Sequence, residues 1–428
     1  MIVKNDRIFA QGVTGVRRAG STTPLTLNDR INFGSCTKLL TATIAARLID
    51  RGLIQWNSKV RDIFPEKVST YNAAFLDVTL NDILAHRAGI EENVYYNNNH
   101  WATFSVATGT TSQLRALVCD EVLSDTPEVT KGTFLYANQG FSVAAAMLER
   151  VSGKSWEDLM QQEVFAPLHM TTAGLGVSYD DALPPKGPVG HTLSGTTWVP
   201  NSAFTGSLLQ HYQASNGPGG TVICTLADYA KLLTVYCDGG KNSTYLTTAT
   251  RTQLLTTWLN GVKGDGSGND YYAHGVFVMP ASMQPWVGST GQALNHGGDI
   301  FGEDTLFWVG TARNFIILLY TNAAIEGSAD SNALNEIVTA LINKYPSSST
   351  VTGPYIDGPA MAAAAKSGST FTLTGYTLPT GVYQLQSSTD LSTWTNSGAT
   401  VTATDFTTAF TATISGTQHP YYRIKTVP

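Results

Sequence analysis

A glycine–serine step at the head of a long apolar pattern determines what the first fifty residues can form. Gly34 and Ser35 follow a short apolar approach, and apolar residues then recur at three- and four-residue spacing from 39 to 49. This spacing predicts a helix with one buried face, and Gly52 predicts its stop, because glycine adopts the left-handed conformation without strain. Ser35 therefore opens the helix, and Lys38 projects from the same side of its first turn.

The Ser35–Lys38 pair has a chemical interpretation and a structural one. A serine hydroxyl is a poor nucleophile until a base removes its proton, and a lysine amine does so only where burial lowers its pKa. The helix N-terminus adds positive potential and unpaired backbone N–H groups. The structural alternative is a capping serine followed by a surface lysine. Cys36 points away from the lysine, so the pattern disfavours a cysteine nucleophile.

Composition excludes several classes of partner. The chain has 428 residues, enough for two or three domains, with 14% charged residues and a net charge of −6. Without a run of Lys or Arg, nucleic acid and anionic membranes are disfavoured. No apolar stretch reaches the roughly 18 to 20 residues of a membrane span. The four cysteines lack metal-ligand spacing, and a Cys224–Cys237 disulfide stays open.

The chain in order predicts a mixed helical and strand architecture. An N-terminal hairpin is expected over 1–18, and the Gly- and Pro-rich range 173–218 reads as ordered loops. Expected helices cover 78–90, 112–123, 141–152, 155–164, 226–236, 247–258 and 330–344. Expected strands cover 273–279, 292–296, 305–309 and 314–321, in an antiparallel meander. This layout implies one sheet built from both ends of the chain, with the helical region inserted.

The loop regions supply weaker candidates. The helix over 78–90 starts with a Thr cap and stops at glycine; within it, His86 is expected to hold a turn by hydrogen bonds, with acid/base chemistry as the alternative. The following loop is rich in Asn and aromatic residues, which border ligand clefts in many proteins. Tyr95, Tyr96 and Trp101 are its candidates for an acyl pocket.

Two further motifs can complete a site around Ser35. Tyr136 and Asn138 stand in a tight loop before a helix, where a phenolate near a lysine can accept a proton and an amide can bind a carbonyl. In the second motif, His296, Gly297, Gly298 and Asp299 end a strand. Its glycines let a substrate lie against the backbone, and the Asp299 N–H can join that of Ser35 in cradling an oxyanion. Alone, each motif is also consistent with a capped helix or a turn.

Together, the three motifs resemble those of the serine β-lactamase and penicillin-binding-protein superfamily. The pattern Ser-x-x-Lys, Tyr-x-Asn and His-x-Gly is similar to its class C-like branch, which includes family VIII-type carboxylesterases and D-aminopeptidase-like hydrolases. In this sequence the pattern falls on Ser35 and Lys38, on Tyr136 and Asn138, and on His296 and Gly298. The resemblance covers about residues 1–345.

The resemblance implies an α+β, β-lactamase/transpeptidase-like fold: an antiparallel sheet flanked by helices, an inserted all-helical domain, and the site in the cleft between them. The expected divisions are 1–56 with 220–345 for the α/β part, 57–219 for the helical part and cleft loops, 346–369 for a linker and 370–428 for a small β module. It also implies acylation of Ser35, with Lys38 and Tyr136 sharing the base role. Neither a metal nor an organic cofactor is implied.

Two departures from the family pattern bear on localisation. The chain starts within what should be the first strand, and charged residues follow Met1 almost at once, so no secretory signal opens it. We therefore expect a truncated N-terminus and a periplasmic or secreted native form, with a cytoplasmic protein as the alternative. The final β module, similar to modules of secreted bacterial proteins, favours the first.

The leading functional hypothesis is a carboxylesterase or D-amino-acid amidase acting on small esters, amides or peptides. It rests on His296, which stands where true β-lactamases mostly carry lysine, because a neutral histidine is a poor partner for a substrate carboxylate. The alternatives are a β-lactamase or penicillin-binding D,D-peptidase, and a non-catalytic cell-wall-binding protein. Acyl preference, stereochemistry and oligomeric state are not legible in the sequence.

Overall fold

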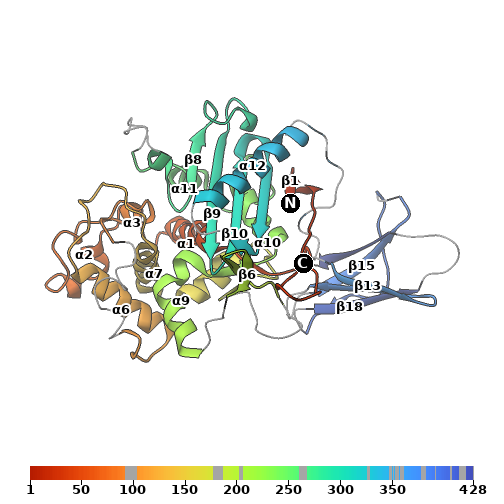
Figure 1. Cartoon of the computed structure of the whole chain (residues 1–428), viewed down its shortest axis with the longest axis horizontal. Coiled ribbons are helices and arrows are strands. Elements are labelled where there is room, and N and C mark those ends of the chain that lie inside the picture. The colour runs from red at the N-terminus through yellow and green to blue at the C-terminus, as the bar shows by residue number, and fades with distance from the viewer. Residues whose placement is uncertain are drawn as a thin grey trace.

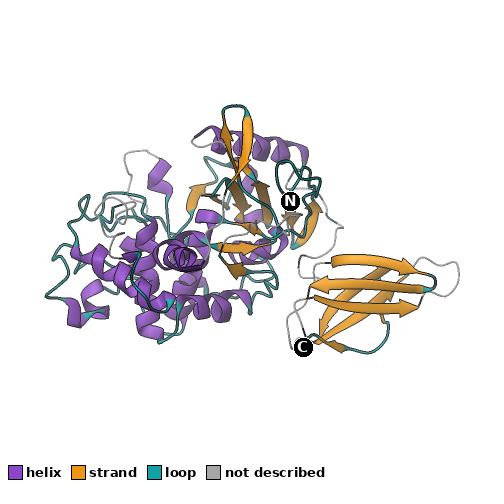
Figure 2. Cartoon of the chain, turned by 60° about the horizontal axis from the view of Figure 1, so that its bottom comes forward, coloured by secondary structure: helices purple, strands orange, loops and turns teal. Residues whose placement is uncertain are grey.

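Three parts lie side by side in the computed structural model: a helical part, a central sheet covered by helices, and a C-terminal group of strands (Figure 1). Figure 2 shows the C-terminal strands set beside the rest of the chain. The structure describes residues 1–91, 104–176, 187–201, 206–259, 268–324, 328–346, 349, 351, 356, 361–376, 382–390, 392–404, 407–413 and 421–427.

The central sheet has six antiparallel strands in the order β2-β1-β11-β10-β9-β8. Its strands are β1 (Ile2–Lys4), β2 (Arg7–Ala10), β8 (Phe277–Pro280), β9 (Gln292–Ile300), β10 (Glu303–Gly310) and β11 (Phe315–Thr321). The turn between β1 and β2 has positive φ at Asn5 and Asp6, residue types that tolerate it. Since Ile2 pairs with Ile317, the sheet is built from both ends of the chain, as predicted.

Helices bury both faces of this sheet. On one face α1 (Thr37–Asp50) and α10 (Leu226–Leu233) share a core with β10 and β11 that includes Leu39, Tyr229 and Phe307. On the other face α12 (Ser328–Lys344) packs its Val338 against Leu306 and neighbouring strand residues. Alternating side chains of β10 serve the two cores, as the two-residue period of a strand requires.

The helical part lies at one side of the sheet (Figure 1). Its members are α2 (Val60–Ile63), α3 (Leu80–Leu84), α6 (Thr111–Ser124), α7 (Asn138–Ser152), α8 (Trp156–Met160), a π-helical turn η3 (Gln161–Phe165) and α9 (Gly206–Gly220). The 3-10 turn η2 (Pro65–Lys67) follows α2 in the helical part. Beside the sheet lie α11 (Thr248–Leu254) and the 3-10 turns η1 (Gly34–Cys36), η4 (Thr234–Tyr236), η5 (Gly268–Tyr271), η6 (Pro285–Val287) and η7 (Thr311–Arg313). Small sheets join β3 (Ile31–Asn32), β7 (Val222–Cys224) and β4 (Gly174–Leu175), and β12 (Ala323–Ala324), β5 (His191–Ser194) and β6 (Thr197–Pro200).

The prediction of loops over 173–218 is wrong for its described second half. The hairpin of β5 and β6 and the helix α9 occupy it. Glycine and proline have low helix propensity, but burial outweighs propensity here, because α9 is buried from Ala214 to Gly219. The absence of side chains lets it approach its neighbours: a Cβ on Gly217 would lie 3.8 Å from Trp156, and one on Gly219 would lie 3.3 Å from Lys38 Nζ.

Helix α3 begins as predicted and ends earlier. Thr79 caps it in a reciprocal capping box with Asp82. The helix then stops at Leu84, well before the predicted glycine, because His86 takes the left-handed conformation, φ +57°, that closes a helix. Gly89 serves the loop instead: a Cβ there would lie 2.4 Å from the Val129 carbonyl oxygen.

The C-terminal strands have their own small core of Leu373, Leu385, Phe410 and neighbours. They are β13 (Met361–Ser367), β14 (Thr370–Tyr376), β15 (Val382–Ser388), β16 (Thr395–Asn396), β17 (Val401–Thr402), β18 (Thr407–Thr413) and β19 (Tyr421–Val427). Strand β13 lies within 346–369, where the sequence predicted a linker, and pairs with β14. In the segment that connects α12 to these strands, the Ile356 N–H donates to the carbonyl oxygen of Asp6, in the turn between β1 and β2, at 3.0 Å.

Two findings bear on the earlier questions of redox state and membranes. All four cysteines are buried free thiols, so Cys224 and Cys237 are not joined in this structure. Among the described helices, none combines the length and apolar character that a membrane crossing requires.

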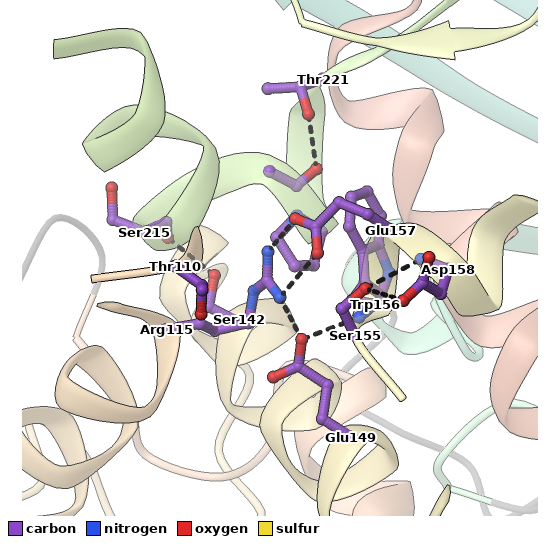
Figure 3. A network of polar contacts seen from close by, with 12 residues as sticks. Thr110, Arg115, Ser142, Glu149, Ser155, Trp156, Glu157, Asp158, Ser215 and Thr221 are labelled. Carbon is purple, nitrogen blue, oxygen red and sulfur yellow. Dashed lines mark hydrogen bonds and ion pairs between the residues drawn. The ribbon is translucent and has the colours of Figure 1, made fainter. Parts of the chain in front are cut away.

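A buried arginine ties the helical part together (Figure 3). Arg115 of α6 has no exposed side-chain surface and pairs with Glu149 of α7 and with Glu157 of α8, the latter at 2.5 Å. Glu149 also accepts the Trp156 N–H at 2.7 Å. The guanidinium therefore joins three helices through charge-assisted hydrogen bonds.

We expect Arg115→Met to lower the free energy of unfolding by about 3–5 kcal/mol, because it leaves the largely buried Glu149 carboxylate and the partly exposed Glu157 carboxylate without their cation. Arg150→Met is the matched control, because its ion pair with Glu66 is half-exposed, and we expect it to cost less than about 1 kcal/mol. Urea denaturation of both variants checks this, and equal losses would contradict the assignment.

Candidate active site

Ser35 sits in the 3-10 turn η1, directly before α1, and is partly exposed. The turn is fixed on both sides. Asn32 Oδ1 accepts the Gly34 N–H at 2.9 Å, and the Tyr229 hydroxyl donates to the Cys36 carbonyl at 2.9 Å. The Tyr229 ring also stacks on Phe33 at 4.0 Å between centroids. The hydroxyl of Ser35 is thus carried by a turn with little freedom to move.

Lys38 is completely buried beside this serine. Its Nζ donates to Ser35 Oγ at 3.0 Å, to Asn138 Oδ1 at 2.7 Å and to the Gly219 carbonyl at 2.8 Å. Three acceptors match the three protons of an ammonium group. The arrangement therefore suits a charged lysine that orients the serine hydroxyl, rather than a neutral amine.

The second motif, Tyr136 and Asn138, lies beside Lys38 of the first motif. Tyr136 lies just before α7, with Lys38 Nζ 4.7 Å from its ring centroid, and Asn138 is the first residue of α7. Tyr136 and Ser35 line one pocket of about 390 Å³. Because the Asn138 oxygen is held by Lys38, its NH₂ group is the end that can bind a substrate carbonyl.

The third motif reaches the serine through two glycines. A Cβ on Gly298 would lie 2.0 Å from the Phe33 carbonyl oxygen, and a Cβ on Gly34 would lie 2.9 Å from the Asp299 nitrogen. Only glycine permits this contact between η1 and β9, which brings the backbone N–H groups of Ser35 and Asp299 to adjoining segments. Gly297 differs, because it is exposed, with only the Thr305 oxygen near its would-be Cβ at 3.9 Å. Its backbone borders the pocket.

His296 is buried and neutral. Its Nδ1 donates to the Gly297 carbonyl at 2.5 Å, so its Nε2 accepts the Tyr272 hydroxyl at 3.1 Å. Burial, and then the charge of Lys38, lowers the pKa of His296 to about 3. The histidine therefore presents no cation to the pocket near neutral pH.

Cys36, next to the serine, has no features of a nucleophile. Its Sγ donates to the His296 carbonyl at 3.3 Å, and burial raises the pKa of its thiol to about 12. In the described part of the chain, no three His, Cys, Asp or Glu side chains gather as a metal site.

His86 holds a turn, as predicted. Its carbonyl oxygen accepts the Leu135 N–H at 2.8 Å, and its Nδ1 accepts the Ala137 N–H at 3.1 Å. Tyr95, Tyr96 and Trp101, the predicted acyl-pocket residues, lie outside the described residues.

Three contributors were missed by the sequence analysis. Gly219 contributes a backbone oxygen, which no residue type signals, from a helix that was predicted as loop. Tyr272, whose hydroxyl donates to His296 Nε2, stands just before the predicted strand over 273–279 and belongs to none of the three motifs. Tyr229 lies on the predicted helix over 226–236, whose buried face was the available signal.

Comparisons with known proteins identify the family and the fold of this chain. The profile of the family described as Beta-lactamase matches residues 1–341. Penicillin-binding protein 4 of Amycolatopsis lactamdurans is 24% identical over 345 residues, covering 77% of this chain and 81% of the relative.

Two solved structures share the fold at low identity. A penicillin-binding protein from Bacillus halodurans has a TM-score of 0.57 and 19% identity, covering 79% of this chain and 95% of its own. A D-stereospecific amidohydrolase from a Streptomyces species has a TM-score of 0.54 and 20% identity, covering 72% and 86%.

The buried histidines predict an acid-sensitive fold. Burial lowers the pKa of His86, His274 and His296, to about 4 for His274 and about 3 for His296. The unfolded chain takes up these protons below about pH 6.5 while the folded chain does not, so stability falls as the pH drops. Each histidine then removes about 1.4 kcal/mol of unfolding free energy per pH unit.

We expect His274→Gln, outside the pocket, to reduce the dependence of unfolding free energy on pH by about 1.4 kcal/mol per unit between pH 6 and 5. Urea denaturation at pH 7, 6 and 5 measures this. The same slope in variant and wild type would show that His274 is not held neutral.

Proposed function

Since this chain belongs to the Beta-lactamase family, we propose that it is a serine hydrolase that forms an acyl-enzyme at Ser35 and releases it with water. Its substrates are small esters or amides, of the carboxylesterase or D-amino-acid amidase type. The observation that carries the proposal is the Lys38 ammonium, 3.0 Å from Ser35 Oγ and held by two further acceptors. Such preorganised charge beside a hydroxyl is what nucleophilic catalysis needs.

In the proposed acylation, Tyr136 is the base and Lys38 stays charged. The phenolate takes the proton of Ser35 as Oγ attacks the substrate carbonyl carbon, and the nearby ammonium stabilises that phenolate. The N–H groups of Ser35 and Asp299 bind the oxygen that becomes negative. When the bond to the alcohol or amine breaks, Tyr136 returns the proton to it. A water molecule then attacks the acyl-enzyme carbonyl carbon and gives its proton to Tyr136. The bond to Ser35 Oγ breaks, Tyr136 returns the proton to Oγ, and the acid product leaves.

Apart from the buried Lys38 ammonium beside Ser35, the described pocket offers no cation to a substrate carboxylate. Asp299 and Asp304 line it, His296 is neutral, and none of its described lining residues is Lys or Arg. A β-lactam or a peptide ending in a free carboxylate would find no Lys, Arg or charged histidine among these lining residues to pair with that carboxylate. This supports esters and amides over β-lactams.

The second candidate is a β-lactamase or penicillin-binding D,D-peptidase, which the similarity to Penicillin-binding protein 4 supports. The D-stereospecific amidohydrolase of the same fold supports the amidase alternative within the leading proposal. A non-catalytic cell-wall-binding protein is the least favoured, because such a protein has no need of an ammonium held beside a serine. For the native protein we propose a periplasmic or secreted location.

We expect Ser35→Ala to lower the hydrolysis of short p-nitrophenyl esters by about 10³-fold or more, because the nucleophile is lost. A fluorophosphonate should add one adduct to the wild type, located by intact-mass and peptide mass spectrometry on the peptide containing Ser35. Cys36→Ala, the matched neighbour, should keep the rate within a few-fold. Equal rates in Ser35→Ala and wild type would remove the proposal.

We expect His296→Lys to raise kcat/KM for nitrocefin relative to a p-nitrophenyl ester by about 10-fold, because it brings a cation toward the substrate carboxylate. His296→Gln, which is also neutral, is the control and should leave the ratio unchanged. Steady-state kinetics of both variants with both substrates decides this, and the same change in both variants would show that charge at this position does not select the substrate.

A further inference from the structure

We propose that His86 is a positioning residue that fixes the phenol of Tyr136 for proton transfer. The inference rests on the proposed function, since it concerns the same base. His86 is buried, with 2% of its surface exposed, and is absent from the lining of the pocket, so it acts through Tyr136 and not on the substrate.

The first support is that His86 accepts hydrogen bonds from the backbone on both sides of Tyr136. The His86 carbonyl oxygen accepts the N–H of Leu135, and its Nδ1 accepts the N–H of Ala137, at 2.8 and 3.1 Å. These are the residues directly before and after Tyr136. The imidazole also lies against the phenol ring, with 4.2 Å between centroids. One residue thus sets both the backbone and the ring of the base.

The neighbouring Arg87 holds the start of the same loop. The Gly132 N–H donates to the Arg87 carbonyl at 2.8 Å, and Arg87 Nη1 donates to the Gly132 carbonyl at 3.1 Å. Its guanidinium lies near Phe134, at 5.4 Å from the ring centroid. Arg87 therefore anchors the start of this loop independently of His86. The bonds that His86 accepts at its carbonyl oxygen and Nδ1 come from the residues next to Tyr136.

The second support is that histidine is costly at this position. Its φ of +57° is a conformation in which glycine or asparagine is usual. Its Nε2 is buried and has no hydrogen-bond partner among the described residues. Because Nδ1 accepts a bond, the ring proton is on this Nε2, so a donor goes unsatisfied. A residue needed only to end α3 would avoid both costs, and such costs gather at functional sites.

The protonation state fits positioning rather than acid/base catalysis. Burial, then the charges of Lys38 and His296, lowers the pKa of His86 well below its ordinary value. The ring therefore stays neutral, and Nδ1 keeps its lone pair for the Ala137 N–H. With that lone pair in use and Nε2 carrying the proton, no nitrogen is left to accept a proton from a substrate or from Ser35.

Two variants and a matched control separate this role from plain structural support. His86→Phe keeps a ring and loses the acceptor, whereas His86→Asn keeps an acceptor that tolerates positive φ. The control is His191→Phe, because His191 is also buried, and its Nε2 accepts the Ala19 N–H at 2.9 Å, away from the pocket.

With p-nitrophenyl esters, we expect His86→Phe to lower kcat by about 30- to 100-fold with KM within about 3-fold, because a misplaced base slows chemistry more than binding. The acid limb of its pH–rate profile should move to higher pH, because the phenol moves away from the Lys38 charge. His86→Asn should recover part of kcat. His191→Phe should lower Tm while kcat and the acid limb stay as in wild type.

If His86→Phe lowers Tm but leaves kcat and the acid limb unchanged, the inference is overturned. If that variant does not fold, His86→Leu, which also lacks the acceptor, is measured in its place: an acid limb that moves to higher pH supports positioning, and an unshifted limb overturns it. Ser35→Ala is assayed alongside. Full activity in Ser35→Ala would reject the proposed function itself, whereas an inactive Ser35→Ala with an unaffected His86→Phe would reject only the role of His86.

Discussion

The buried ammonium of Lys38 is the interaction on which the rest of the site depends. A charge removed from water costs several kcal/mol unless its protons all find acceptors. Here the acceptors come from three distant stretches of sequence: Ser35 in η1, Asn138 at the start of α7 and Gly219 at the end of α9. Satisfying this one charge requires the helical part to dock onto α1, so the bonds that hold the two parts together also aim the serine hydroxyl.

A second constraint is the backbone contact between η1 and β9, which tolerates no side chain. The would-be Cβ of Gly298 collides with Phe33, and that of Gly34 approaches Asp299, so both positions require glycine. The contact sets the distance between the serine turn and the strand end more tightly than packed side chains would, because backbone cannot change rotamer. Tyr229 and Asn32 then remove the remaining freedom of the turn.

Much of this was legible in the sequence because it depends on local pattern. The spacing after Ser35 predicted α1, and short apolar runs between glycine-rich turns predicted β9 and β10. The boundaries differ: Ser35 lies in η1 before α1, Asn138 is already in α7, and β9 continues past residue 296 to Ile300. What failed depended on tertiary context. Burial made α9 helical against its glycine content, and His86 ended α3 in a conformation usually left to glycine. The Gly219 carbonyl could not be foreseen, because a backbone oxygen has no signature in residue type.

The Lys38 charge also adds to the effect of burial on its neighbouring histidines, which links the proposed mechanism to the proposed substrate choice. Burial alone disfavours charge on His86 and His296, and the ammonium of Lys38 lowers both pKa values further. A neutral His86 keeps the acceptor that holds the Tyr136 loop, and a neutral His296 leaves the pocket wall without a partner for a substrate carboxylate. Since Lys38 is required for the proposed chemistry, any cation gained at position 296 must be held against its repulsion. In the proposed mechanism, the preference for esters and amides therefore depends first on the burial that keeps His296 neutral and then on the Lys38 charge beside the serine.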